Sequence, residues 1–136
     1  MPIWNFCNPI DSDALKLFED HFDFHIAPPL RDFLLNHNGG KTRHCSLPTH
    51  VRERRIESLL DFSKEESAWA INRRMRRLLG EKFIVIGTDR TGNLLCVRRN
   101  MRKQEFVVWN HITNNLEDCV LDIPIVLMYW QNEERS

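Results

Sequence analysis

The stretch PPLRDFLLNHNGG, residues 28–40, decides the fold. A proline suits the first turn of a helix, because its missing N–H costs no hydrogen bond there. Four residues follow at the i, i+3, i+4, i+7 spacing of one helical face: Leu30, Phe33, Leu34 and His37. The helix should stop at the three residues Asn38, Gly39 and Gly40, since glycine readily takes the left-handed conformation that closes a last turn.

A second marker, further along the chain, predicts a β-hairpin. Residues 83–87 have the pattern of an apolar strand, and residues 94–98 have the pattern of the next strand. Residues 88–93 between them have the pattern of a turn. Asp89 can accept hydrogen bonds from the backbone ahead of it, and Gly92 can take a positive φ. We prefer this tight turn to a calcium loop, because the alternating oxygen ligands and the distal glutamate of such a loop are missing.

The remaining segments complete an α+β pattern. We expect helices over about 12–22 and 67–79, and strands over about 44–47 and 106–110. Ser63 and Glu66 have the spacing of a capping box. The charged residues 99–105 should form a hairpin loop, whereas residues 53–62 fit helix and strand templates equally poorly. At the end of the chain, residues 123–130 favour a helix begun by Pro124 over a strand.

These elements predict one α+β domain over residues 1–136, with a central, mostly antiparallel sheet flanked by helices. Hydrophobic residues make up 42% of the chain, which suffices for a core. The N-terminus lacks the features of a secretion signal, and no apolar run reaches the roughly 18 residues of a membrane span. The four cysteines include no Cys-x-x-Cys pair. We therefore expect a cytoplasmic protein with reduced thiols, no cofactor and no membrane contact.

The charges cancel over the whole chain but are unevenly distributed. Residues 1–40 carry two positive and six negative side chains. Residues 41–110 carry sixteen positive and eight negative side chains, and residues 111–136 carry one positive and five negative. Internal balance within the fold is the preferred interpretation, and a surface for a charged partner is the alternative. The arginine-rich segments 73–77 and 98–103 are interpreted mainly as solvated surface. Nucleic-acid binding is disfavoured because no tryptophans are interleaved with them.

Three motifs in this order resemble the SUKH superfamily, which is named partly for fungal cell-wall regulators and consists mainly of bacterial immunity proteins. The first is Pro29, Phe33, Leu34 and Asn38-Gly39-Gly40. The second is Ile86-Gly87 followed by Asp89-x-x-Gly92-Asn93. The third is Trp109-Asn110-His111, where relatives commonly have Trp-Asp-His. Order and spacing match over about residues 14–111.

The resemblance implies a sheet flanked by helices and a task without catalysis. Members typically bind a cognate protein toxin, often a nuclease, and block it within the producing cell. Others are adaptors or scaffolds, so a regulatory adaptor is the alternative function. The shared motifs suit turns and helix ends, so they identify the fold rather than the partner.

No catalytic or metal-binding residues are predicted. His21 and His25 are four apart, but no third ligand is evident. Cys45 is adjacent to His44, and neighbours on a strand point to opposite faces. Arginine and aromatic side chains commonly anchor interfaces, so five residues are candidates for contact with a protein partner: Arg90, Arg98, Arg99, Trp109 and His111. Alternatively, Trp109 packs in the core and His111 ends a strand. The oligomeric state is left open.

Overall fold

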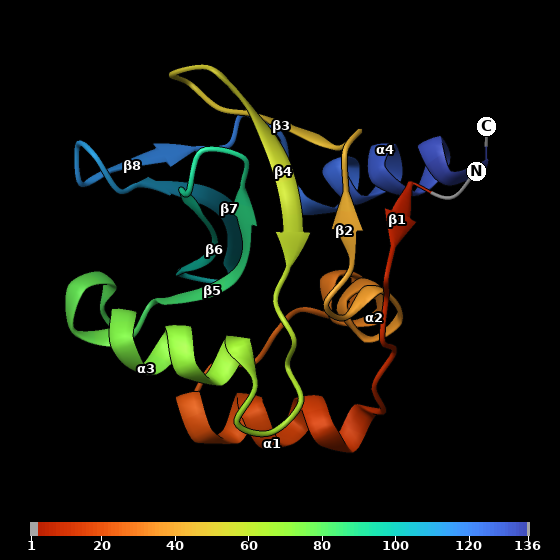
Figure 1. Cartoon of the computed structure of the whole chain (residues 1–136). Coiled ribbons are helices and arrows are strands. Elements are labelled where there is room, and N and C mark those ends of the chain that lie inside the picture. Colours follow the sequence, from red (N-terminus) through yellow and green to blue (C-terminus); the bar gives the residue numbers. More distant parts are fainter. Residues whose placement is uncertain (1–2, 136) are drawn as a thin grey trace.

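A computed structural model describes residues 3–135, and over this range four helices pack around one eight-stranded sheet (Figure 1). The helices are α1 (Ser12–Phe22), α2 (Pro28–His37), α3 (Ser67–Leu79) and α4 (Ile123–Arg135). The strands are β1 (Trp4–Asn5), β2 (Lys41–Thr42), β3 (Ser46–Pro48), β4 (Glu53–Leu59), β5 (Phe83–Asp89), β6 (Leu94–Asn100), β7 (Lys103–Asn110) and β8 (Asn115–Asp118). The predicted α+β class with an antiparallel sheet is confirmed.

The sheet curls back on itself. Its main order is β1-β2-β4-β5-β6-β7-β8, and β3 pairs separately with β4. All of these pairs are antiparallel. A bridge between Thr49 and Cys119 then joins the segment after β3 to the segment after β8. The His50 N–H donates to the Asp118 carbonyl at 3.1 Å, and the Val120 N–H to the Pro48 carbonyl at 3.0 Å. The outer strand β8 is therefore held at its end by β3.

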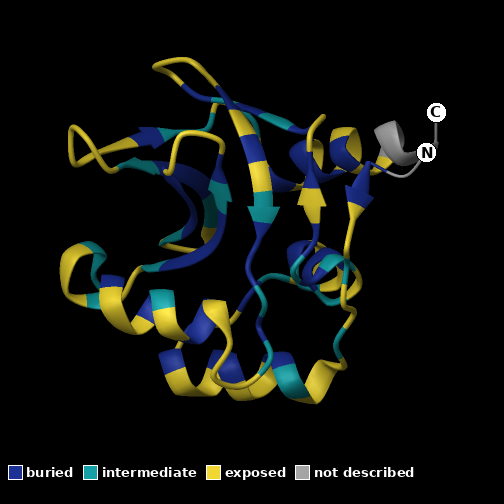
Figure 2. Ribbon diagram, in the orientation of Figure 1, coloured by how far each residue is buried: buried dark blue, intermediate teal, exposed yellow. Residues whose placement is uncertain are grey.

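The two N-terminal helices begin and end where the sequence predicts. Asp11 Oδ1 accepts a 2.8 Å hydrogen bond from the Ala14 N–H and caps α1. Helix α2 runs from Pro28 to His37, and Gly39 follows with φ +69°. The inner faces are buried, as Figure 2 shows. Six side chains make these faces: Leu15, Phe18, Phe22, Leu30, Phe33 and Leu34.

Asn38 explains why an asparagine precedes the two glycines. Its side chain is fully buried. Its Nδ2 donates to the Asn8 carbonyl at 3.1 Å and to Asp61 Oδ1 at 2.8 Å, while its Oδ1 accepts from the Phe62 N–H at 2.7 Å. One side chain thus ties the end of α2 to the N-terminal segment and to the β4–α3 connection.

Helix α4 completes the core, which confirms the helical interpretation of the C-terminal segment. Trp130 is fully buried and its ring stacks 5.5 Å from that of Phe106 on β7. The same ring contacts Phe33 and Trp4, each at 5.8 Å between centroids. Its Nε1 donates to the Ser46 carbonyl at 2.9 Å. Trp130 therefore joins α4 to β1, β3, β7 and α2.

Two local predictions are wrong. Ser63 and Glu66 form no capping box, and no side chain caps α3. Instead, Ser63 donates its backbone N–H to Asp61 Oδ1 at 2.9 Å. The predicted loop over residues 99–105 is also wrong, because β6 and β7 continue to a two-residue connection, residues 101–102. Charge does not exclude a strand here, since charged side chains pair across the ladder.

The ambiguous segment 53–62 contains β4. Its alternation was hidden because the inward position 54 is an arginine, which is buried. The short strand expected at residues 44–47 lies slightly later, as β3. Strands β1, β2 and β8 were not predicted, since each has only two to four residues.

Candidate functional site

The turn between β5 and β6 is organised by the carboxylate of Asp89. Its Oδ1 accepts hydrogen bonds from the backbone N–H groups of Thr91 at 2.9 Å and Asn93 at 2.8 Å. Its Oδ2 accepts from Asn93 Nδ2 at 3.0 Å. Gly92 has φ +86°, a conformation that side chains rarely adopt. The predicted tight turn is confirmed, and its motif residues serve the turn itself.

This turn also positions His111, which follows β7. Asn93 Oδ1 accepts from the His111 backbone N–H at 3.2 Å and lies 2.7 Å from its Nδ1. An amide oxygen only accepts, so Nδ1 carries the proton and Nε2 of the neutral ring is the acceptor. A Cβ placed on Gly92 would lie 3.4 Å from the His111 ring. The exposed imidazole is therefore held in one orientation by two motifs that lie far apart in the sequence.

The loop between β7 and β8 is held by its own side chains. Half-buried Trp109 donates its Nε1 proton to Asn114 Oδ1 at 2.8 Å. Asn110 Oδ1 accepts from the backbone N–H groups of Ile112 at 2.9 Å and Thr113 at 3.2 Å. Its Nδ2 also donates to Glu117 Oε2 on β8 at 3.3 Å.

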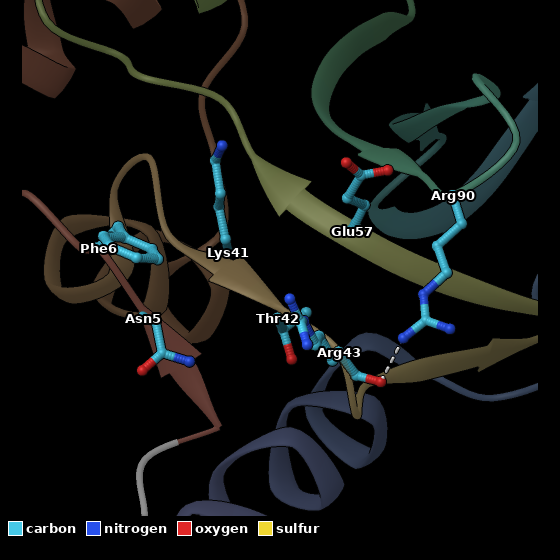
Figure 3. Close-up of a pocket in the computed structure, with 7 residues that line it drawn as sticks. All are labelled: Asn5, Phe6, Lys41, Thr42, Arg43, Glu57 and Arg90. Carbon is cyan, nitrogen blue, oxygen red and sulfur yellow. Dashed lines mark hydrogen bonds between the residues drawn. The ribbon is translucent and has the colours of Figure 1, made fainter.

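Arg90, in the β5–β6 turn, also lines an open groove of about 710 Å³ (Figure 3). Its lining comes from β1, β2, β4 and the β5–β6 turn: Asn5, Phe6, Lys41, Thr42, Arg43, Glu57 and Arg90. Arg90 Nη2 donates to the Arg43 carbonyl at 2.7 Å, which fixes its side chain across the groove. Arg90 thus belongs both to the turn and to the groove. We call the turn, residues 109–114 and the groove together the turn-end surface.

The five candidate contact residues divide into two groups. Arg90, Trp109 and His111 lie on the turn-end surface. Arg98 and Arg99 lie at the opposite end of β6, four or five residues from Leu94, or about 13–16 Å along a strand. The structure therefore does not bring the five together. Of the groove lining, sequence reasoning found only Arg90, because the rest come from separate strands.

Arg98 and Arg99 already have partners within the chain. Arg98 forms ion pairs with Glu105 at 2.6 Å and Asp118 at 3.1 Å. The hydrogen bond to Glu105 raises the pKa of this guanidinium above its ordinary value. The Arg99 guanidinium lies 5.1 Å from the centroid of the Phe24 ring. A partner would have to compete with these contacts.

The arginine-rich α3 helix is likewise paired in part. Arg73 makes two 2.6 Å hydrogen bonds to the carboxylate of Glu65, and lies 5.6 Å from the Trp69 ring centroid. The hydrogen bond from Arg73 lowers the pKa of Glu65. Arg76 donates to the Phe22 carbonyl at 2.8 Å. Glu65 therefore offsets part of the positive charge of this helix.

Two of the four thiols, Cys45 and Cys96, are buried. Burial raises the pKa of the Cys96 thiol to about 12, so it stays protonated at neutral pH. Cys45 is buried while His44 is exposed. Among the side chains that the structure describes, residues 3–131, no group of three or more His, Cys, Asp or Glu could hold a metal ion. The turn-end surface offers hydrogen-bonding, cationic and aromatic groups, which suit recognition.

Comparison with known proteins agrees with the two sequence markers. The family model described as SMI1 / KNR4 family (SUKH-1) matches residues 9–122, a span that contains α1, α2 and every strand from β2 to β8. No curated protein matches the chain. None of the helices described here is both long enough and apolar enough to span a membrane.

Proposed function

Because the chain belongs to the SMI1 / KNR4 family (SUKH-1), we propose that it binds and neutralises a cognate protein toxin. The observation that carries the proposal is the turn-end surface, where Asp89, Asn93 and Asn110 hold exposed groups in place. A surface ordered before binding loses little conformational entropy when a partner docks. We therefore place the primary contacts on Arg90, Trp109 and His111.

This surface would neutralise the toxin by covering its active site in a one-to-one complex. A stable complex of this kind buries about 800 Å² on each partner, around a few aromatic or arginine anchors. Trp109 and His111 closely precede Ile112, which is 82% exposed in the loop between β7 and β8. Arg98 and Arg99 would take part only if the toxin extended along β6. Such blocking would take place in the cytoplasm of the producing cell.

A regulatory adaptor is the second candidate, since it would use the same ordered surface on an endogenous protein. Nucleic-acid binding has less support. Arg73 and Arg98, one from each basic segment, are engaged by carboxylates. Those pairs would have to be broken before either side chain could neutralise a phosphate.

Co-expression with a toxin tests the proposal. The toxin to test is the C-terminal domain of any large exported protein that proves to be encoded beside this chain. We expect the intact chain to rescue growth and the double variant Arg90→Glu/His111→Ala to lose rescue. The matched control is Arg77→Glu, an exposed arginine on α3. Failure of the intact chain to rescue, with circular dichroism showing that it is folded, would refute toxin neutralisation. An adaptor would show no rescue but would bind an endogenous protein.

A further inference from the structure

Phe6 projects into the groove from an unusual backbone conformation. Trp4 on β1 is buried and Asn5 is exposed, so alternation along a strand would turn the next side chain inward. Phe6 instead has φ +60°, and its side chain is 83% exposed. A positive φ is a genuine outlier for a bulky residue, and such strain concentrates at functional sites. The backbone thus presents an aromatic ring to solvent at the rim of the groove.

The groove is predominantly cationic. Lys41, Arg43 and Arg90 contribute positive charges to its lining, and Glu57 contributes the negative charge. Among the residues that the structure describes, no carboxylate forms an ion pair with any of these three cations. Figure 3 shows Lys41 of β2 and Glu57 of β4 projecting on the same side, with Phe6 just beyond the end of β1. The groove therefore combines a net positive charge with an exposed apolar ring.

We propose that the groove binds an acidic segment of the protein partner, with carboxylates at Lys41, Arg43 and Arg90 and an apolar side chain against Phe6. Arginine forks match carboxylates in geometry as well as charge. The inference deepens the proposed function, on which it rests, by naming the chemistry of the partner segment. A nucleic acid fits less well, because one exposed ring is a poor stacking platform for successive bases.

The test is an NMR titration of the ¹⁵N-labelled full chain. The probe is a capped synthetic peptide in which four glutamates flank one tryptophan. We expect shifts in the backbone amides of Phe6, Lys41, Arg43 and Arg90. The matched peptide with glutamines should bind at least about fivefold more weakly, because charge carries the contact. High salt should weaken the acidic peptide further, since the groove is open to solvent.

Variants locate the site. The double variant Lys41→Glu/Arg43→Glu should weaken peptide binding by about tenfold or more, and Phe6→Ala should weaken it without changing the salt dependence. The control Arg74→Glu/Arg77→Glu reverses the charge of two exposed arginines of α3 and should have no effect.

Unchanged peptide affinity in the groove variant would overturn the proposal. So would tighter binding of a ten-nucleotide thymidylate at the same amides, which would indicate nucleic acid. If the groove variant still neutralises the toxin, the groove assignment fails while the proposed function stands.

Discussion

Arg54 on β4 donates two hydrogen bonds to the carboxylate of Glu117 on β8, across 63 residues of sequence. The Nε–Oε1 distance is 2.7 Å and the Nη2–Oε2 distance is 2.5 Å, and both side chains are buried. The hydrogen bond from Arg54 lowers the pKa of Glu117, and the same bond raises the pKa of Arg54. The carboxylate also accepts from Asn110, so the pair links the curled sheet to the 109–114 loop.

Breaking this pair from one side should be costly. Glu117→Gln leaves the Arg54 charge buried without its counter-ion, so we expect the free energy of unfolding to fall by about 3–5 kcal/mol. Urea denaturation monitored by tryptophan fluorescence measures the change.

Replacing both partners separates charge from packing. In Arg54→Met/Glu117→Leu no unpaired charge remains, and we expect stability to recover most of the loss seen in Glu117→Gln. A double variant less stable than Glu117→Gln would show that the pair contributes net stability. Backbone NMR of both proteins should confirm that β4 and β8 stay paired.

The pair also predicts a pH dependence. Because the pKa of Glu117 is lower in the folded chain than its reference value of 4.5, the unfolded chain takes up this proton first as pH falls. Its contribution is therefore complete above about pH 4.5 and is lost as pH falls through the folded-state pKa. Between about pH 5 and 3 we expect Glu117→Gln to lose less stability than the intact chain. Urea unfolding across this range is the measurement, and equal slopes for the two proteins would contradict it.

Asn38 should matter to stability and to a neighbouring pKa. Asn38→Ala leaves the buried Phe62 N–H without an acceptor, so we expect a loss of about 3 kcal/mol. Burial favours the neutral form of Asp61, but hydrogen bonds from Asn38 and Ser63 outweigh it and lower the Asp61 pKa. The variant should therefore raise that pKa, as followed by carboxyl ¹³C NMR. The control Asn36→Ala changes an exposed asparagine in the last turn of α2, the helix that Asn38 ends. A stable Asn38→Ala with an unchanged Asp61 titration would contradict this role.

The Asp89 turn should control the orientation of His111. Asp89→Ala removes the acceptor of the Thr91 and Asn93 N–H groups, and we expect a loss of about 2 kcal/mol. Without it, Asn93 no longer holds Nδ1 of His111 in one tautomer. We expect the ¹⁵N shifts of the His111 ring to move toward a mixture of tautomers, whereas those of exposed His50 stay unchanged. Unaltered His111 shifts would show that the turn does not position the ring.

The sequence predicts those features of the fold that depend on residues close together in the chain. Helix α2 and the Asp89 turn are local, because Pro28, Gly39 and Gly92 act through their own backbone, and both are confirmed. Strand β4 was ambiguous because Arg54 occupies an inward position that only its distant partner Glu117 makes tolerable. The capping box failed because Asp61, outside the motif, engages Ser63.

The candidate contact residues and the groove also depend on residues that are distant in sequence. His111 was chosen as a candidate from residue type, but its fixed orientation depends on Asn93, eighteen residues away in sequence. Arg98 resembled an exposed anchor, yet Glu105 and Asp118 already bind it. The groove was missed because its lining comes from separate strands, and no linear motif records that arrangement.

The central claim is that this chain acts by binding a protein and not by catalysis. The most direct measurement is the residual activity of a purified candidate toxin domain, taken from any exported protein encoded near this chain and titrated with increasing amounts of the chain. We predict that toxin activity falls linearly and reaches its minimum at an equimolar ratio, with a stable complex in size-exclusion chromatography. Complete inactivation far below equimolar ratio would reveal an enzyme instead, and full toxin activity in an excess of folded chain would contradict the account altogether.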